Sequence, residues 1–459
     1  MERFDVVVVG ARCAGSPLAA MLARRGLRVC LLDRAQFPSE TLSTHLIQPR
    51  GVIILDRLGV LDAVLAAGAA PLTRFTLVAE DARIDAEFGV EMFGAPGLSV
   101  RRVTMDQLLV EAAASAGAEV RTGTRVTGLV QEDGRVAGVE TEQGSIRAPL
   151  VVGADGRRST VADAVGAAEY HVAPAGRLFT WAYFEGVAET EGRMRIARLG
   201  DLAFLASPTD AGLYMAAVCP ALDAKDDFLA DREGSFKTGL AAWPELDDLL
   251  AGASRIGPIR VMGSWHGYFR EAAGPGWALV GDAGHFKDPS PGQGITDALR
   301  QADQLAGAVE AGLGGAVSLD DELGHWWRWR DEEAYEMHWF ATDTGEAGPS
   351  PPVATQLIRD IAADPGATEQ LLRMFNRDIR PSEVFTPRRI GKAIARAGRD
   401  RPDQIPAVVR EVASALRKQI RRSRQRRGPA ARAARATRRR ARAAPGPPTP
   451  SPAPAERPL

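Results

Sequence analysis

The stretch from Phe4 to Arg34 limits the possible folds of this 459-residue chain more than any other stretch does. Phe4–Val9 is an apolar run that is long enough for a buried strand and too short to span a membrane. A turn containing two glycines, Gly10–Gly15, leads into a helical pattern that ends at Gly26, where a left-handed helix cap costs glycine little. Val29–Leu32 is a second apolar run. This order predicts a strand, a glycine turn, a helix and a second, parallel strand.

The glycine turn has the spacing of a dinucleotide-binding βαβ unit, although an ordinary glycine turn is the alternative. Gly10 would allow the tight turn, Gly15 would let helix and strand pack closely, and pyrophosphate would lie at the helix N-terminus. Asp33 ends the second strand, near the usual spacing for a carboxylate that accepts from ribose hydroxyls. Arg12 stands where the second glycine belongs, so its side chain would face phosphate or solvent. The predicted binding residues here are Gly10, Ala11, Arg12, Ala14, Gly15, Asp33 and Arg34.

Composition excludes several classes of protein. Cys13, Cys30 and Cys219 are scattered and form no CxxC pair, so neither a disulfide framework nor a zinc site is expected. This cysteine usage fits a reducing cytoplasm. The first strand starts at residue 4, which leaves no room for a signal peptide, and no long apolar segment predicts a transmembrane helix. We expect a cytoplasmic globular protein that binds no metal.

The net charge of −1 hides an asymmetry between the body of the chain and its end. The segment from Val409 to Leu459 holds 15 basic and 2 acidic residues. From Arg421 the composition shifts to Arg, Ala and Pro, which cannot bury enough apolar surface to offset the entropy of ordering. The tail has neither interleaved aromatic residues nor a recognisable module, so no specific nucleic acid is expected as a partner.

The rest of the chain predicts an α/β fold with two sheets. Apolar and polar residues alternate over Pro71–Val100, and candidate strands follow one another through Phe179–Pro258. Long helical patterns cover Ile295–Ala311 and Leu319–Ala341. We predict a discontinuous FAD/NAD(P)-binding Rossmann-like domain (1–70, 100–170 and 259–318), a second β-sheet substrate domain (71–99 and 171–258), a helical C-terminal region (319–420) and a disordered basic, Pro-rich tail (421–459).

Two later stretches favour FAD over NAD as the tightly held dinucleotide. Val151–Gly166 is a strand, the pair Asp155-Gly156 and a helix start. Trp277–Ala306 is a strand, the pair Gly281-Asp282, a Pro/Gly loop and a helix. A simple NAD dehydrogenase needs neither stretch. FAD carries a ribityl chain and a flavin ring far from its adenosine, so a second binding site distant in the chain makes physical sense.

Together these stretches resemble the flavoprotein monooxygenases of the para-hydroxybenzoate hydroxylase type and their relatives, the geranylgeranyl reductases and flavin-dependent halogenases. The resemblance covers roughly Phe4 to Ala311. Its four markers, in order, are Gly10…Gly15 with Asp33, Arg102-x-x-Met105-Asp106-x-x-Leu109, Asp155-Gly156, and Gly281-Asp282 with Pro291-Gly292-Gln293-Gly294. The family usually has Asn where Thr296 stands. The halogenase WxWxIP pattern is absent, which disfavours halogenation.

The resemblance implies roles for particular residues. Asp33 would bind the adenosine ribose, Arg102 an FAD phosphate or ribityl oxygen, and Val126 the adenine through its backbone. Asp155, with Gly156, would fix the cofactor and the nicotinamide donor, and Asp282, with Gly281, would accept from the ribityl chain. The flavin ring would lie against Pro291, Gly292, Gly294 and Ile295, with the positive end of the helix directed at its N1–C2=O edge.

Two histidines are candidate catalytic residues, although a lone histidine in a loop is more often a surface residue. His45 follows the second strand and His285 follows Asp282, and both loops border the flavin in the family that the chain resembles. The pair Lys287-Asp288 is either a local ion pair or a feature of the flavin side.

The resemblance implies an FAD-dependent oxidoreductase, and we favour an NAD(P)H-dependent monooxygenase of a small aromatic or polycyclic substrate. NAD(P)H would reduce FAD, and O2 would then form a flavin hydroperoxide. One alternative is a C=C reductase or dehydrogenase of the geranylgeranyl reductase type, which needs no oxygen. Another class of alternative is a binding protein that uses the basic tail on nucleic acid or an anionic membrane. The sequence leaves the substrate, the choice of NADH or NADPH and the oligomeric state open.

Overall fold

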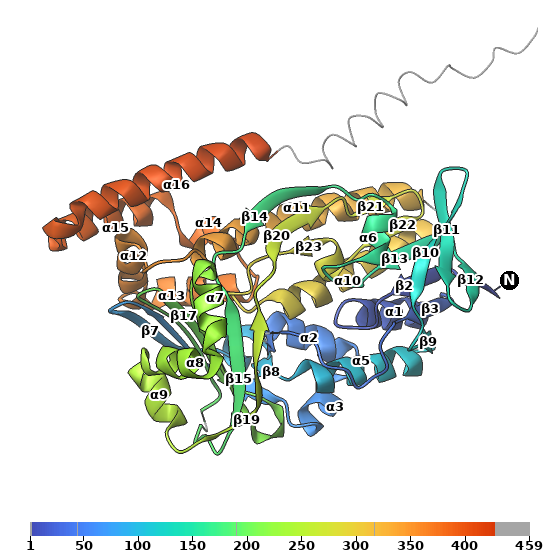
Figure 1. Cartoon of the computed structure of the whole chain (residues 1–459). Coiled ribbons are helices and arrows are strands. Elements are labelled where there is room, and N and C mark those ends of the chain that lie inside the picture. Colours follow the sequence, from blue (N-terminus) through green and yellow to red (C-terminus); the bar gives the residue numbers. More distant parts are fainter. Residues whose placement is uncertain (1, 44, 190, 316, 427–459) are drawn as a thin grey trace, which may run out of the picture.

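The structure, a computed structural model, describes residues 2–43, 45–189, 191–315 and 317–426 (Figure 1). Its first sheet has six strands in the order β21-β22-β13-β2-β3-β9. The strands are β2 (Val6–Val9), β3 (Val29–Leu32), β9 (Glu119–Arg121), β13 (Leu150–Gly153), β21 (Ala273–Gly274) and β22 (Trp277–Leu279). All neighbouring pairs from β22 to β9 are parallel. Every residue of β2, β3 and β13 is buried, as expected for parallel strands covered on both faces.

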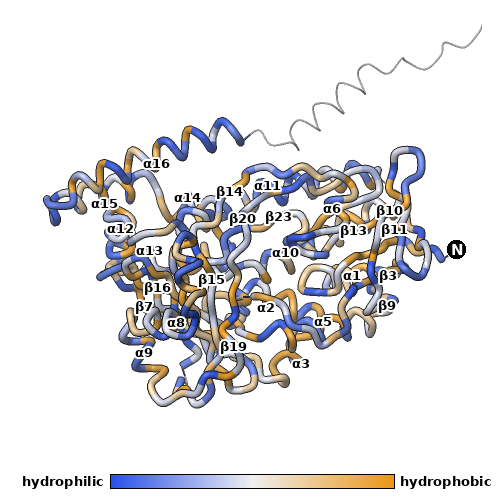
Figure 2. The backbone as a smooth tube through the Cα atoms, viewed as in Figure 1, coloured by the Kyte–Doolittle hydropathy of each residue, from blue (hydrophilic) through white to orange (hydrophobic). Residues whose placement is uncertain are grey.

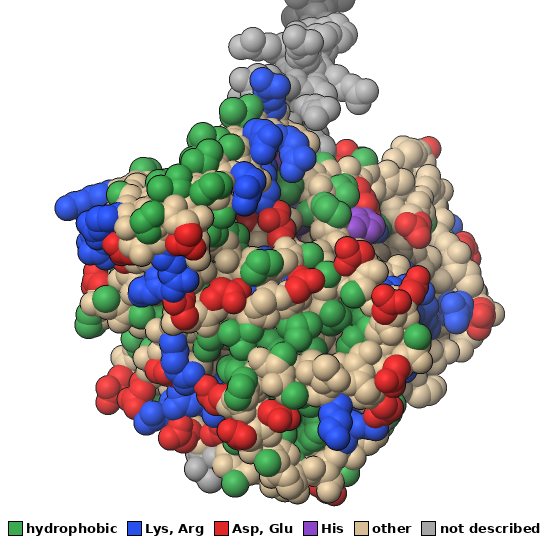
Figure 3. Space-filling view, turned by 60° about the vertical axis from the view of Figure 1, so that its left-hand side comes forward, with side chains coloured by type: hydrophobic (Ala, Val, Ile, Leu, Met, Phe, Trp, Pro, Cys, Tyr) green, Lys and Arg blue, Asp and Glu red, His purple; other side chains and the backbone are tan. Residues whose placement is uncertain are grey.

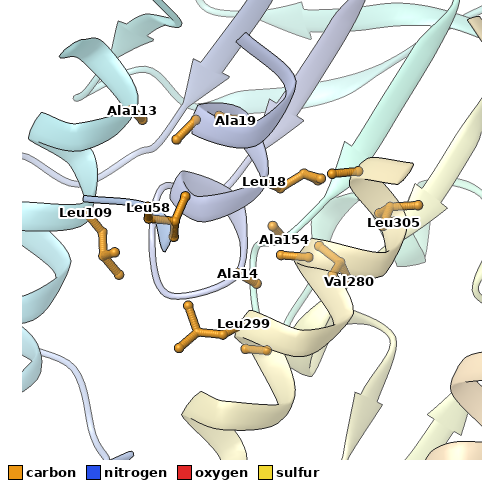
Figure 4. Close-up of a cluster of buried hydrophobic side chains, with 14 of the residues drawn as sticks. Ala14, Leu18, Ala19, Leu58, Leu109, Ala113, Ala154, Val280, Leu299 and Leu305 are labelled. Carbon is orange, nitrogen blue, oxygen red and sulfur yellow. The ribbon is translucent and has the colours of Figure 1, made fainter. Parts of the chain in front are cut away.

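Three helices cover one face of this sheet: α1 (Gly15–Arg24), α5 (Arg102–Ser115) and α10 (Gly294–Leu313). Figure 4 shows α1, which carries Leu18 and Ala19, between α5 with Leu109 and α10 with Leu305. The helix α1 ends at Arg24, and Gly26 follows with φ of 83°. The predicted strand–turn–helix–strand unit and its glycine stop are therefore confirmed.

The second large sheet has seven strands in the order β19-β15-β18-β17-β16-β6-β7. They are β6 (Arg74–Ala79), β7 (Ala82–Glu87), β15 (Phe179–Glu185), β16 (Arg193–Leu199), β17 (Leu202–Pro208), β18 (Tyr214–Cys219) and β19 (Ser254–Met262). Two segments far apart in the chain thus share one sheet, because β6 pairs with β16 in parallel. Strand β19 continues past residue 258, where the sequence places a domain boundary. The domain limits themselves stay a prediction.

Helices lie on both faces of the seven-stranded sheet. One face packs on α7 (Lys225–Ala230), α8 (Arg232–Ala241) and α9 (Pro244–Leu250) through an apolar cluster that includes Phe204 and Trp243. The other face carries Phe75 and Met215 and packs on the C-terminal helices through Phe375. In Figure 2 orange, hydrophobic residues and blue, hydrophilic ones are interspersed in this part of the molecule. Alternating side chains thus serve two separate cores.

The fold also contains shorter strands and helices. Three small sheets are β1 (Glu2–Arg3), β12 (Gly144–Arg147), β11 (Arg135–Thr141) and β10 (Val126–Glu132); β14 (Glu169–Pro174), β20 (His266–Arg270) and β23 (His285–Phe286); and β4 (Leu46–Ile47), β8 (Gly97–Ser99) and β5 (Ala70–Leu72). Four short helices are α2 (Pro49–Arg57), α3 (Leu61–Ala66), α4 (Val90–Phe93) and α6 (Thr160–Ala164).

The C-terminal region is helical, as predicted. Its helices are α11 (Leu319–Thr344), α12 (Pro352–Ala362), α13 (Pro365–Phe375), α14 (Pro381–Val384), α15 (Pro387–Asp400) and α16 (Ile405–Gln425). The predicted start of disorder at residue 421 is wrong, because α16 continues to Gln425 and Arg422 pairs with Asp343 of α11. The remainder of the predicted tail, 427–459, lies outside the described residues. Within the described residues, no helix is both long and apolar enough to cross a membrane.

Candidate functional site

A cavity lies between the carboxyl edge of the six-stranded sheet and the seven-stranded sheet. One side is formed by Arg102, by the first turn of α10 and by the loop that leads from β22 into α10. The other side is an apolar wall made of Phe179, Trp181, Leu205, Met215, Ala217, Met262 and Phe286. A crevice at the carboxyl ends of parallel strands is where open α/β sheets bind ligands.

The glycine turn between β2 and α1 is tightly packed. A Cβ on Gly10, which has φ of 104°, would lie 2.5 Å from the carbonyl oxygen of Ala154. A Cβ on Gly15 would lie 1.8 Å from the carbonyl oxygen of Gly10. The packing roles predicted for both glycines are therefore confirmed. The N–H groups of Arg12, Cys13 and Ala14 donate to no acceptor among the described residues, so they remain available to an anion.

Asp33 holds the glycine turn from the end of β3. Its two carboxylate oxygens accept from the N–H of Ala11 at 2.8 Å and from the N–H of Ala35 at 2.7 Å. Each carboxylate oxygen can accept a second hydrogen bond, so a ribose hydroxyl could still bind. The neighbouring Arg34 is exposed. The ribose contact predicted for Asp33 and the cofactor role of Arg34 stay predictions.

The side chain of Arg12 pairs with a buried carboxylate, and the phosphate contact considered from the sequence stays a prediction. Its guanidinium donates to Asp106 at 2.9 Å and to the hydroxyl of Ser39 at 3.1 Å, and it lies over the ring of Phe37. Asp106 is fully buried and also binds Arg102 through two bonds of 2.8 and 2.9 Å. A carboxylate shielded from water attracts both guanidinium groups strongly, so Asp106 holds Arg12 and Arg102 beside the glycine turn.

Asp106 is a residue whose part in the site the sequence did not reveal. It orients Arg102, which lines the cavity from the first turn of α5. The two residues are four apart on one helix, a spacing at which opposite charges meet. This spacing, which lies inside the sequence marker Arg102-x-x-Met105-Asp106, could have indicated the pairing of Arg102 with Asp106.

Asp282 lies in a short 3-10 turn, Gly281–Ala283, and faces the cavity. Gly281 has φ of 62° and donates its N–H to the side-chain oxygen of Gln301 at 3.0 Å, which fixes the turn. The carboxylate of Asp282 accepts no hydrogen bond within the described part of the chain. Burial raises its pKa, against the opposing effect of nearby Arg157 and Arg102. Such a carboxylate can accept a hydrogen bond from a ligand in the cavity.

The first turn of α10 forms the floor of the cavity beside Asp282. A Cβ on Gly294 would meet nothing within 4 Å, so the backbone there opens directly onto the cavity. The preceding Pro291-Gly292 turn is tight, because a Cβ on Gly292 would lie 2.6 Å from Leu46. Ile295 lines the cavity. Thr296 instead turns inward and accepts from the N–H of Gln48 at 2.8 Å.

Comparison with known protein families settles which ligand this arrangement serves. The family described as FAD binding domain matches residues 3–320. The chain belongs to this flavoprotein family. This family is consistent with the predicted para-hydroxybenzoate hydroxylase and geranylgeranyl reductase superfamily. The predicted superfamily and the prediction of FAD as cofactor are therefore confirmed.

Named relatives of this flavoprotein include both oxygenases and reductases. It is 30% identical over 312 residues to a 6-methylpretetramide 4-monooxygenase of Streptomyces rimosus, covering 65% of this chain and 73% of that protein. It is 28% identical over 346 residues to a menaquinone reductase of Mycolicibacterium smegmatis, covering 68% of this chain and 77% of that protein. The flavin-dependent brominase Bmp2 has the same fold, with a TM-score of 0.69 over 87% of this chain and all of that one, at 19% identity.

The residues of the cavity fit the chemistry of FAD. The unpartnered carboxylate of Asp282 can accept from a ribityl hydroxyl, and the open backbone at Gly294 leaves room for a flat ring. The free N–H groups after Gly10 suit a pyrophosphate. Where each part of FAD lies remains a prediction at the level of single residues.

Two charged residues of the flavoprotein's cavity are not paired with each other. Lys287 forms an ion pair with Asp297 of α10, whose other oxygen accepts from Arg377 at 3.1 Å. Burial lowers the pKa of Lys287 to about 8, although Asp297 opposes this shift. Asp288 accepts from the N–H of Ser290 at 2.9 Å, and burial raises its pKa to about 6. Both line the cavity, so the local Lys287–Asp288 ion pair is wrong.

The two candidate catalytic histidines are both buried, which makes the alternative of surface residues wrong. His285 lines the cavity, with its Nε2 3.3 Å from Nδ1 of His338. Nε2 of His338 lies 2.9 Å from the carbonyl oxygen of His171 and must donate to it, so Nδ1 of His338 accepts from His285. His45 binds the hydroxyl of Tyr183 at 2.5 Å and does not line the cavity. A catalytic role for either stays a prediction.

Stability of the flavoprotein is expected to fall between pH 7 and pH 5 because buried histidines are held neutral. Burial lowers the pKa of His338 to about 3. In the unfolded chain the pKa is about 6.5, so the unfolded state gains a proton first on acidification, and stability present above pH 6.5 is lost as pH falls towards 3. His338→Gln should remove about 2 kcal/mol of the pH 7 to pH 5 loss in the free energy of unfolding, measured by chemical denaturation.

His325 on the same helix provides the control for this prediction. Its side chain is 62% exposed, so His325→Gln should keep the full acid-induced loss. Equal pH dependence of the His338 variant and the parent would contradict the assignment of His338 as a buried neutral histidine.

The cavity lining leaves out the predicted cofactor residues of the glycine turn, and it also leaves out Asp155, Gly156 and Val126. Asp155 caps α6, accepting from the hydroxyl of Ser159 at 2.5 Å and the N–H of Thr160 at 2.7 Å. Gly156, with φ of 79°, forms the turn beside it. Val126 is buried at the start of β10. The contacts predicted for them with cofactor or nicotinamide therefore remain predictions.

The apolar wall of the cavity was not predicted from the sequence. Phe179 and Trp181 alternate along β15, and Met215 and Ala217 alternate along β18. Because side chains two residues apart share one face of a strand, this alternation was the available signal. Only the tertiary structure shows which face turns to the cavity and which to α7–α9.

Proposed function

We propose that this flavoprotein is an NAD(P)H-dependent monooxygenase of a small aromatic or polycyclic substrate. The observation that carries the proposal is the cavity itself, in which an aromatic and apolar wall lies opposite the predicted flavin side. The predicted flavin side presents Asp282 and the first turn of α10. A flat apolar substrate would be sandwiched between the two sides. The Streptomyces rimosus relative named as a monooxygenase supports the same reading.

Residues of the chain contribute binding, orientation and exclusion of water in this proposal. Asp282 would hold the ribityl chain, and the N-terminal N–H groups of α10 would stabilise negative charge placed near them. The wall around Trp181 and Met215 would exclude water from the substrate. Bound FAD would supply the redox chemistry with O2 and NAD(P)H.

A flavin-dependent C=C reductase is the second candidate. Menaquinone reductase from Mycolicibacterium smegmatis and a digeranylgeranylglycerophospholipid reductase from Methanosarcina mazei are relatives, at 28% and 27% identity. An apolar wall would receive a prenyl chain as readily as a ring system. The two candidates differ in their need for oxygen.

The deciding experiment is flavin reduction and oxygen consumption by the FAD-loaded protein. With NADH or NADPH under anaerobic conditions, the flavin absorbance should bleach, and admitting oxygen should restore it with release of peroxide. Polycyclic phenols that bind should accelerate oxygen uptake and convert peroxide release into hydroxylated product. The reductase would instead be established by two results together. Neither nicotinamide would reduce the flavin with any ligand present, and a C=C compound would reoxidise dithionite-reduced flavin in the absence of oxygen.

Filling the cavity separates substrate binding from flavin reduction. Ala217 lies on the wall and is 4% exposed, so Ala217→Phe would occupy substrate space. The variant should bind FAD normally and lose at least tenfold of its substrate-stimulated oxygen uptake. Normal stimulation in a folded variant would show that the substrate lies elsewhere.

A further inference from the structure

The outward face of α16 carries an apolar stripe that no part of the described chain covers. Ile405, Val409, Leu416 and Ile420 are 46%, 60%, 55% and 55% exposed. At 100° per residue these four side chains fall within about 60° of the helix circumference. Large apolar side chains exposed singly are common, whereas an aligned row of four on one helix marks an interaction surface.

Basic side chains lie along one flank of this stripe. Arg410, Arg417, Arg421 and Arg424 are all exposed. On the helical wheel these four arginines lie roughly 40–100° beyond Ile420, which forms one edge of the apolar stripe. None of the four side chains makes an ion pair or a hydrogen bond with another described residue. Their charges are therefore free to meet a negatively charged partner.

The opposite face of α16 is bound to the body of the protein. Glu411, the helix's acidic residue, accepts from the N–H groups of Val353 and Ala354 at the start of α12, at 2.7 and 3.0 Å. Lys418 and Arg422 pair with Asp343 of α11. The inward charges are thus balanced, and every charged side chain on the outward half of the helix is basic.

Figure 3 shows the result on the surface. Green apolar side chains descend from the point where the grey chain begins, with blue basic side chains beside them. In Figure 2 hydrophobic and hydrophilic residues alternate along the same helix within each turn. The helix is 21 residues long, about 31 Å.

We propose that α16 docks this flavoprotein on an anionic lipid bilayer, lying in the plane of the membrane surface. The apolar stripe would enter the boundary between headgroups and acyl chains, and the four arginines would meet acidic headgroups. A helix with a basic polar face and a separate apolar face has the design of an interfacial membrane helix. A protein partner would need complementary acidic and apolar surfaces, whereas an anionic bilayer supplies both along the whole helix.

Vesicle flotation of the full-length, FAD-loaded protein tests the proposal. Binding is expected to vesicles made of equal parts phosphatidylglycerol and phosphatidylcholine, and to be weak or absent with phosphatidylcholine alone. Raising the salt concentration should weaken it. Leu416→Ser/Ile420→Ser should weaken binding more than tenfold, and Arg417→Gln/Arg421→Gln about fivefold per arginine. A chain ending at Arg426 should still bind, because the docking surface lies within α16.

Leu65→Ser/Val90→Ser provides the matched control, since these residues are 40% and 63% exposed on α3 and α4. It should bind vesicles as the parent does, and FAD content should report correct folding of every variant. Unchanged binding by the stripe variant, or loss of all binding in the chain ending at Arg426, would overturn the proposal. A dimer in sedimentation velocity would also overturn the proposal, if Leu416→Ser/Ile420→Ser dissociated the dimer and the parent protein did not bind vesicles. A second copy of the chain would then be the partner that covers the apolar stripe. Salt-sensitive binding to nucleic acid without vesicle binding would overturn it as well.

Discussion

Gly15→Ala is expected to abolish retention of FAD and to lower the free energy of unfolding by about 3 kcal/mol, near the upper end for overpacked sites. The added methyl group would lie 1.8 Å from the carbonyl oxygen of Gly10 and 3.1 Å from Cβ of Ala154. Relief requires α1 to move away from β2, and this movement displaces the free N–H groups that are predicted to hold the pyrophosphate. Chemical denaturation and the flavin absorbance of the purified protein measure the two effects.

Gly307→Ala is the matched control for Gly15→Ala. Gly307 lies inside α10, and a Cβ there would meet nothing within 4 Å. The same chemical change should therefore leave FAD bound and stabilise the protein by up to about 1 kcal/mol, because alanine favours a helix over glycine. A Gly15→Ala variant that keeps its flavin and its stability would contradict the first binding motif.

Asp282→Ala is expected to weaken FAD binding about 10- to 100-fold. A hydrogen bond to a charged group contributes about 1.5–3 kcal/mol. Asp282 is the acidic residue of the described turn Gly281–Ala283, so its replacement by alanine removes the predicted acceptor for the ribityl chain. Titration of the apoprotein with FAD, followed by fluorescence quenching, measures the change in Kd. Full affinity in the variant would remove the ribityl assignment.

The stability of the apoprotein should respond to Asp282→Ala in the opposite direction. The pKa of Asp282 is raised in the folded state, so the folded state holds its proton more tightly than the unfolded chain does. Stability is therefore lost as pH rises through the ordinary carboxyl pKa towards the folded value, and the variant escapes this loss. At pH 7 the apo variant should be at least as stable as its parent. Asp303→Ala is the control, because Asp303 pairs with Arg57 at the surface and should leave FAD affinity unchanged.

Some predictions held because their causes are local in the sequence. The apolar runs of β2 and β3, the glycines and the helix stop at Gly26 lie within one short segment, and steric limits on the backbone fix each of them. Other features join residues far apart, and the sequence did not foresee them. Arg12 meets Asp106 94 positions away, and His45 meets Tyr183 138 positions away.

The sequence by itself determined the βαβ unit, the order of the flavoprotein markers and the helical C-terminal region. Each follows from residue pattern and short-range sterics, which do not depend on the rest of the fold. The tertiary structure decided the apolar wall of the cavity, the pairing of Lys287 with Asp297 and the outward face of α16. These depend on which surfaces meet when two sheets and several helices pack together, because burial and electrostatic attraction act between neighbours in space, whatever their separation along the chain.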